Sequence, residues 1–129
     1  MQLTRENPEF RYTIRAVDPG GVTVNDRRLE RSFFLTPDTL VEDWAAGDVA
    51  ALVPADLEPL LALKPTLVLL GTGPRLRFPS PAVMGACLSR GIGMEVMTNA
   101  AAARTFSVLA GEGRQIVAGF IFDRPVGAT

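Results

Sequence analysis

The chain has 129 residues, of which 47% are apolar, and its formal net charge is −1. This length predicts one domain over residues 1–129, with a core at about residues 10–122 and short polar tails. The apolar fraction argues against a disordered chain. The small net charge provides no field that would attract nucleic acid or anionic lipid, so we expect no nucleic-acid partner.

The residue counts exclude much of the familiar catalytic chemistry. The sequence contains no histidine and one cysteine, Cys87, which falls on the apolar face of a predicted helix. Histidine-dependent nucleophiles, histidine-ligated metals and an internal disulfide are therefore excluded. The carboxylates do not have the spacing of a metal site. We expect no catalytic residue, no metal and no cofactor. The sequence favours a protein without enzymatic activity, although that question stays open.

Two features of the sequence bear on where the protein acts. No stretch approaches about 18 consecutive apolar residues, so we expect no transmembrane segment. The first residues, Met1–Asn7, lack the apolar centre of a secretion signal, which predicts a cytoplasmic protein.

The first third of the chain has the pattern of an antiparallel β-meander. Residues Phe10–Val17 alternate between apolar and polar side chains, as in a strand with one face in water. A turn at Asp18–Gly21 leads to a second strand, Val22–Val24, because proline and glycine favour turns. Another turn at Asn25–Asp26 precedes a third predicted strand, Leu29–Leu35.

The next segment is less regular. Residues Pro37–Ala46 fit either a short strand or one helical turn, and Trp44 either covers one end of the core or anchors a partner. Val49–Val53 is short and apolar, which predicts a buried strand. A helix is predicted over Asp56–Leu63, capped by its first residue, with Pro59 tolerated in the first turn.

The last half of the chain alternates between strands and helices. Thr66–Leu70 is a continuous apolar run, which is typical of a strand covered on both faces. Ser80 and Pro81 can open a helix that Gly91 ends. The remaining predicted elements are a strand at Ile92–Met97, a helix at Ala100–Ala110 capped by Thr98 or Asn99, and a strand at Arg114–Phe122. This order predicts an α/β fold with a C-terminal β-α-β-α-β unit of parallel strands. The N-terminal meander adds antiparallel strands to a mixed sheet or forms a small second sheet.

The chain's one glycine-rich loop follows the strand at residues 66–70. Gly71 and Gly73 suggest a dinucleotide-binding fingerprint, which needs a third glycine and a helix directly after it. Leu76 stands where the third glycine belongs, and Pro74 and Pro79 keep the loop extended. The loop therefore does not fit a nucleotide-binding motif.

The same loop still predicts a place for a small anion. Arg75 and Arg77 lie near the start of the next helix, and helix N-termini attract anions. Ligands of open α/β sheets also bind beyond the carboxyl ends of strands. The candidate binding residues are Gly71, Thr72, Gly73, Arg75, Arg77, Thr98 and Arg104. The alternative is that the glycines shape a tight turn while the arginines are solvated or pair with Glu95 or Glu112.

Part of the sequence also resembles a known family. The residues that carry the resemblance are Pro65–Gly73, Pro79 and Leu88–Arg114, with Gly21–Asn25, Ser32 and Trp44 upstream. They are similar to the Mth-type domain family of unknown function. Its members include the adipogenesis-associated Mth-domain protein and the third assembly factor of mitochondrial respiratory complex I. Where relatives often have Thr-Tyr-Asn, this chain has Thr105-Phe106-Ser107.

The resemblance implies a three-layer α/β fold with a mixed central sheet. It implies no established activity, cofactor or catalytic residue, and the mitochondrial members act through protein contacts. Two functions are therefore expected. The first is a non-catalytic protein-interaction or assembly-factor-like module with protein partners. The alternative is a small-anion or small-ligand binding protein, or an undiscovered enzyme, that uses the crevice at the Gly-Thr-Gly loop.

Overall fold

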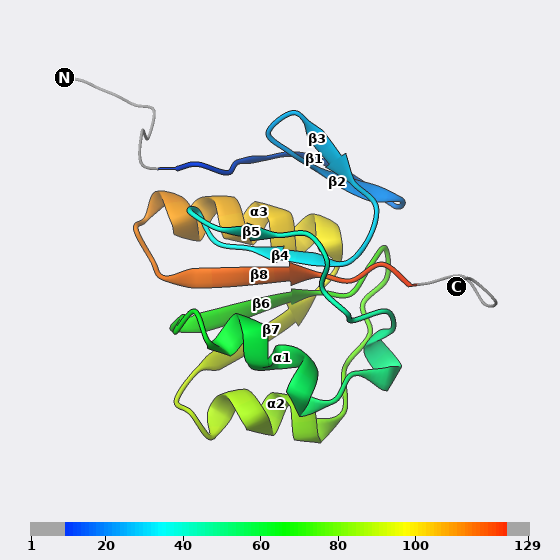
Figure 1. Ribbon diagram of the computed structural model, residues 1–129, viewed down its shortest axis with the longest axis vertical. Coiled ribbons are helices and arrows are strands. Elements are labelled where there is room, and N and C mark those ends of the chain that lie inside the picture. The colour runs from blue at the N-terminus through cyan, green and yellow to red at the C-terminus, as the bar shows by residue number, and fades with distance from the viewer. Residues whose placement is uncertain (1–9, 124–129) are drawn as a thin grey trace.

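A computed structural model describes residues 10–123 of the chain. The predicted polar tails at residues 1–9 and 124–129 lie outside the described residues. The protein has three layers (Figure 1): a central sheet, two helices on one face, and a third helix with a small sheet on the other face. The three-layer α/β fold expected from the sequence and the family resemblance is confirmed.

The strands form two sheets. The small antiparallel sheet contains β1 (Ile14–Asp18), β2 (Gly21–Val24) and β3 (Arg27–Leu29) in that order. The central sheet has five strands in the order β5-β4-β8-β6-β7. Its members are β4 (Phe33–Leu35), β5 (Leu40–Val41), β6 (Leu67–Gly71), β7 (Gly93–Met97) and β8 (Ile116–Phe120). β6, β7 and β8 are parallel, and β4 and β5 extend the sheet with antiparallel pairing.

The alternation of side chains along the strands divides the core in two. Leu67 and Leu69 of β6 pack in one cluster with α3 (Asn99–Gly111) and the small sheet. Val68 and Leu70 of the same strand pack in a second cluster with α1 (Pro54–Leu61) and α2 (Pro81–Leu88). Every residue of β6 is buried, as its unbroken apolar composition predicts.

The two helical crossovers place α2 and α3 on opposite faces of the sheet. α2 leads from β6 outward to the edge strand β7, and α3 leads back from β7, past β6, to β8. Because these steps run in opposite directions along the sheet, two crossovers of the same hand must use opposite faces. The chain leaves β6 toward one edge of the sheet and enters β8 on the other side of β6. The carboxyl ends of β6 and β8 therefore form a topological switch point, the place where open α/β sheets bind ligands.

The predicted third strand, Leu29–Leu35, is wrong because the segment divides between the two sheets. β3 is an edge strand that exposes Arg27 and Arg28, whereas all three residues of β4 are buried. Between them, the Ser32 hydroxyl accepts a hydrogen bond from Phe122 N at 3.0 Å. That bond comes from a residue 90 positions away, so the local alternation could not reveal the break.

The predicted strand Val49–Val53 is also wrong. Val49–Ala51 forms one 3-10 turn, η1, and the Asp48 carboxylate caps it by accepting from Ala50 N at 3.1 Å. α1 then begins earlier than predicted, at Pro54. Asp56 is its third residue, and the Asp56 carboxylate accepts a hydrogen bond from Val53 N at 3.0 Å. Pro59 consequently falls in the second turn of α1, not the first.

Several local predictions are confirmed. Trp44 is 5% exposed, its ring packs edge-on against Phe34 with centroids 5.9 Å apart, and its indole N–H donates to Asp56 O at 2.8 Å. It therefore belongs to the core and does not anchor a partner. Gly91 ends the turn after α2 with φ +72°.

Candidate functional site

The switch point at the carboxyl ends of β6 and β8 is closed by a side chain. Asn99, the first residue of α3, is 3% exposed. Its side-chain oxygen accepts a hydrogen bond from Gly73 N at 3.0 Å, and its amide nitrogen donates to Ile121 O at 3.5 Å. Asn99 N also donates to Gly73 O at 2.9 Å. One buried amide thus joins the segments that follow β6 and β8 to the start of α3.

Gly71 is required by this arrangement. A Cβ atom at residue 71 would lie 2.4 Å from the Asn99 side-chain oxygen and 3.2 Å from the Phe120 ring. A contact of 2.4 Å is shorter than Cβ atoms make in folded proteins, so a larger residue would displace the Asn99 amide. From the sequence, Asn99 was expected only as a possible helix cap. The capping group is in fact Thr98, whose hydroxyl accepts from Ala101 N at 3.2 Å. An asparagine next to a helix start carries no sequence signal that separates a cap from a buried bridge.

Beyond Gly71, the chain forms a loop over residues 72–80, and Thr72 organises its first half. The Thr72 hydroxyl is buried; it donates to Arg75 O at 2.7 Å and accepts from Arg77 N at 3.1 Å. Gly73 has φ +102°, a conformation that glycine adopts without strain. The backbone of this loop is therefore fixed by hydrogen bonds.

Arg77 fixes the second half of the loop. Its guanidinium donates to the Asp123 carboxylate at 2.8 Å and to the Asp48 carboxylate at 2.9 Å. The hydrogen bond to Asp123, and then the attraction of its charge, raise the pKa of Arg77 above its ordinary value, with a further contribution from Asp48. Arg77 thus ties the loop to the segment before η1 and to the segment after β8. Neither partner is Glu95 or Glu112, the carboxylates suggested by the sequence.

The side chains that the loop leaves exposed are largely apolar. Leu76 is 50% exposed and Phe78 is 66% exposed, and they flank the clamped Arg77. Arg75 is exposed and forms no ion pair within residues 10–123. We refer to residues 72–78 as the apolar loop.

A pocket of about 330 Å³ opens beside the apolar loop. Four of the seven predicted site residues line it, namely Thr72, Gly73, Arg75 and Arg77. The other walls are Pro19 and Gly20 in the β1–β2 turn, Glu30, Pro74, and Ile121–Asp123 after β8. Gly71 is buried behind this wall, Thr98 caps α3, and Arg104 is exposed on α3, and none of these three lines the pocket.

Most of the charges that line the pocket are neutralised by ion pairs. Arg77 is paired with Asp123, and Glu30 accepts from Arg28 at 2.7 Å. An incoming anion would therefore meet Arg75 as the cation without an ion-pair partner among the described residues.

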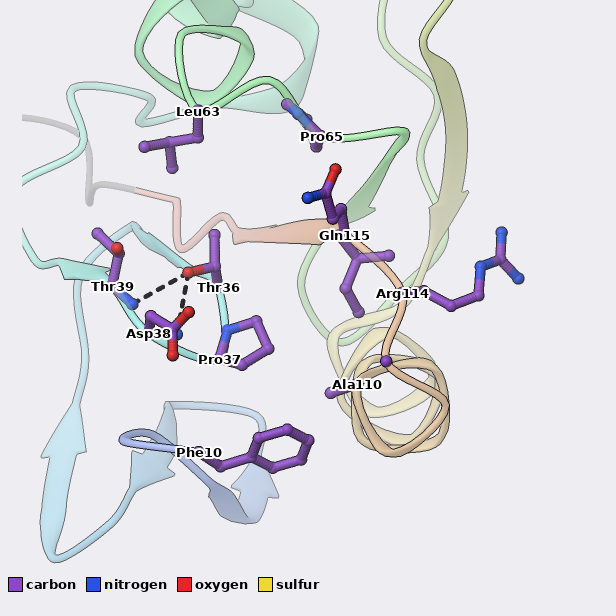
Figure 2. Close-up of a pocket in the computed structure, with 12 residues that line it drawn as sticks. Phe10, Thr36, Pro37, Asp38, Thr39, Leu63, Pro65, Ala110, Arg114 and Gln115 are labelled. Atoms are coloured by element: carbon purple, nitrogen blue, oxygen red, sulfur yellow. Dashed lines mark hydrogen bonds between the residues drawn. The ribbon is translucent and has the colours of Figure 1, made fainter. Parts of the chain in front are cut away.

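A second pocket, of about 370 Å³, lies at the opposite end of the sheet (Figure 2). Figure 2 shows Phe10 and Pro37 on one side, Leu63 and Pro65 on the other, and the Arg114 side chain pointing away from the cavity. Thr36 shapes one wall, because its hydroxyl accepts from Asp38 N at 3.1 Å and Thr39 N at 3.0 Å. This pocket was not predicted from the sequence, because its walls come from segments far apart in the chain.

Two further observations limit the chemistry of the described residues. No group of three or more His, Cys, Asp or Glu side chains in residues 10–123 is arranged to hold a metal ion. Cys87 is fully buried, and desolvation raises the pKa of its thiol. That thiol is therefore not an activated nucleophile.

None of the helices in residues 10–123 has both the length and the apolar composition to cross a membrane.

The fold and this glycine-loop site define a class of small three-layer α/β domains without an assigned reaction. The model of a family described as "Protein of unknown function (DUF498/DUF598)" matches residues 14–121, and the chain belongs to this family. The resemblance to the Mth-type domain family is thereby confirmed.

Three relatives illustrate the family. The chain is 33% identical to a Bos taurus protein named NADH dehydrogenase [ubiquinone] 1 alpha subcomplex assembly factor 3, over 98% of this chain and 68% of that protein. A Xanthomonas campestris protein solved by NMR is 46% identical, with a TM-score of 0.82 and full coverage of both chains. A Bordetella pertussis protein described as an Mth938-like domain is 25% identical, with a TM-score of 0.78 over 95% of this chain and 94% of that one.

Proposed function

We propose that the protein is a non-catalytic, assembly-factor-like interaction module, and that the apolar loop is its contact surface for a protein partner. The observation that carries this proposal is the exposure of Leu76 and Phe78 on a loop whose backbone is held by hydrogen bonds and ion pairs. Neighbouring exposed apolar side chains mark interaction sites more often than isolated ones do, and their burial by a partner is favourable.

The construction of the loop favours tight binding. Association normally costs the entropy of ordering surface loops and side chains. Here Thr72, Arg77 and Asn99 already hold the backbone, and Pro74 and Pro79 restrict it further. Aromatic residues are enriched at the centres of protein interfaces. Phe78 is therefore the proposed anchor, with Leu76 beside it.

Two other findings support a role in binding over one in catalysis. The relative from Bos taurus is named as an assembly factor for a multi-subunit enzyme. The sequence has no histidine, and its one thiol is buried. By this analogy the proposed partners are subunits or other assembly factors of a larger complex.

A cross-linked pull-down from native lysate tests the proposal, with wild type, Phe78→Ser and Val108→Ser compared side by side. Val108 is a matched control, because it is 59% exposed and lies on α3 away from the loop. Loss of a central anchor costs about 2 kcal/mol or more, so recovery of the partner should fall about 30-fold for Phe78→Ser and hold for Val108→Ser. Equal recovery with both variants, or no specific partner with wild type, would contradict the proposal.

A second candidate is a small-anion or small-ligand site in the pocket beside the apolar loop. The observation that favours it is the position of Arg75, which lines the pocket and has no ion-pair partner among residues 10–123. In this candidate Thr72, Gly73 and Arg77 shape the wall, Gly71 and Thr98 act only through the backbone that they position, and Arg104 plays no direct part.

Thermal-shift measurements with phosphate, nucleotides and dicarboxylates test this candidate. A ligand at 100 times its dissociation constant adds about 2.7 kcal/mol of stability. The melting temperature should rise with wild type and stay unchanged with Arg75→Ala. If none of these anions shifts the wild-type melting temperature, or if Arg75→Ala responds equally, the pocket does not bind anions through Arg75.

A further inference from the structure

β7 forms one edge of the central sheet. It pairs with β6 over five residues, from Leu67 with Gly93 to Gly71 with Met97, and no strand of the described chain pairs with its other side. The opposite edge strand, β5, has only two residues. β7 therefore offers the longer free edge of the central sheet.

The backbone groups on that free edge can be assigned from the ladder. Gly93 N donates to Thr66 O at 3.2 Å, and Met97 O accepts from Thr72 N at 2.9 Å. Residues 93, 95 and 97 thus direct their N–H and C=O groups toward β6. In a parallel ladder the alternate residues direct theirs to the other side. The N–H and C=O groups of Met94 and Val96 consequently point outward, and no other backbone or side chain of residues 10–123 bonds to them.

The side chains of β7 leave this edge fit for pairing. Met94 and Val96 pack against the cluster beneath α1 and α2, which holds the strand in place. Glu95 is exposed on the other face and forms no ion pair within the described residues. Edge strands are usually protected by prolines, bulges or several charges. β7 has no proline, an unbroken register with β6 and one charge.

Glu95 selects between two possible occupants. A second copy of the chain that paired antiparallel with β7 over all five residues would place Glu95 directly opposite its own symmetry mate. Like charges in that position destabilise a strand pair, whereas opposite charges stabilise it. We propose that the free edge of β7 accepts an extended strand of another protein, with a lysine or arginine opposite Glu95. The strand would bond to the backbone of Met94 and Val96. This inference concerns a surface apart from the apolar loop and holds whether or not that loop binds a partner.

Two short capped peptides test the inference, Thr-Val-Lys-Val-Thr and the matched Thr-Val-Glu-Val-Thr, titrated into isotopically labelled full chain and followed by NMR. The lysine peptide should shift the amide resonances of β7 and slow hydrogen exchange at Met94 and Val96. The glutamate peptide should bind about fivefold more weakly, because it replaces an attractive cross-strand pair with a repulsive one. Glu95→Lys should reverse the preference.

Val96→Pro supplies a backbone test. It removes an N–H that points to the free edge and leaves the ladder to β6 intact, a position where strands accept proline. Binding of the lysine peptide should be lost while the thermal melt stays cooperative, and Phe78→Ser should bind the peptide normally. Equal binding of the two peptides, resonance shifts away from β7, no shift at millimolar peptide, or a wild-type dimer paired through β7 would each overturn the inference. If Val96→Pro does not fold, the inference is tested by Glu95→Lys alone, and an unchanged preference for the lysine peptide would overturn it.

Discussion

The two ends of the central sheet are built differently. At the carboxyl end, a buried asparagine, a buried threonine hydroxyl and a twice-paired arginine hold the apolar loop. At the amino end, apolar side chains such as Phe10, Leu63 and Pro65 make up half of the residues that bound the pocket of Figure 2. Buried polar groups demand specific partners, whereas apolar walls tolerate many neighbours. The shape of the carboxyl end therefore depends on individual hydrogen-bonding groups. Substitutions there should reduce the free energy of unfolding more than substitutions at the amino end.

The largest difference is expected from the glycines. Gly71→Ala places a methyl group 2.4 Å from the Asn99 amide oxygen, so overpacking and a lost hydrogen bond should cost about 2–4 kcal/mol. Gly113→Ala at the amino end meets no atom within 4 Å, so only its φ of +76° opposes the change, at about 1–2 kcal/mol. Urea denaturation of both variants measures the contrast. Equal losses would show that the carboxyl end adapts as freely as the amino end.

Asn99→Ala should destabilise the protein by about 1–3 kcal/mol, because it leaves Gly73 N buried without an acceptor. The loss should be accompanied by faster hydrogen exchange at Gly73, while Ala101, which Thr98 caps, stays protected. Thr39→Ala at the amino end is the control, since the Thr39 side chain makes no hydrogen bond among residues 10–123. A Thr39 variant as unstable as the Asn99 variant would contradict the proposed difference between the ends.

Arg77→Gln should change the free energy of unfolding only slightly, because ion pairs that are partly exposed contribute little. The expected effect is local: the amides of residues 75–78 should exchange faster, and partner recovery in the pull-down should fall. High salt should mimic the substitution in wild type and have no further effect in the variant. Unchanged exchange in the loop would show that Thr72 alone holds it.

The smallest effect is expected from Asp18, the last residue of β1, next to the turn that borders the pocket at the carboxyl end. Hydrogen bonds from Arg28, and next from Gly20 N, lower the pKa of Asp18 to about 2. The pKa of an aspartate in the unfolded chain is about 3.9. The stability that Asp18 contributes to the folded state is therefore complete above that pH and is lost as the pH falls toward 2. Asp18→Asn should remove this part of the acid sensitivity. A melting-temperature profile between pH 5 and 2 that is identical to wild type would exclude a role for Asp18.

The sequence predicted the parts of the fold that depend on local patterns. The apolar runs gave β6 and β8, and the glycine after α2 and the threonine before α3 marked helix boundaries. It failed where distant contacts decide. Ser32 breaks the strand Leu29–Leu35 because it bonds to Phe122, and Asp48 turns a predicted strand into a 3-10 turn.

The candidate site was predicted in outline. The glycine-rich loop and its arginines were identified from their position after a buried strand, and four of the seven residues line one pocket. The partners of Arg77 lie 29 and 46 residues away, so no spacing rule could have found them. Asn99 escaped notice for the same reason, because its role depends on Gly73 and Ile121 being brought beside it. The function of these seven residues stays a prediction.

The position of β8 has a consequence for biosynthesis. It is the last strand of the described chain to be translated, yet it lies between β4 and β6, and Figure 1 shows it running through the middle of the sheet. A nascent chain that lacks β8 cannot join β5-β4 to β6-β7, and both halves keep an unpaired inner edge. Non-local pairing of this kind is slow, and unpaired edges aggregate. The sheet therefore cannot close until β8 has left the ribosome, so folding of the domain is expected to wait until nearly all of residues 10–123 have been released.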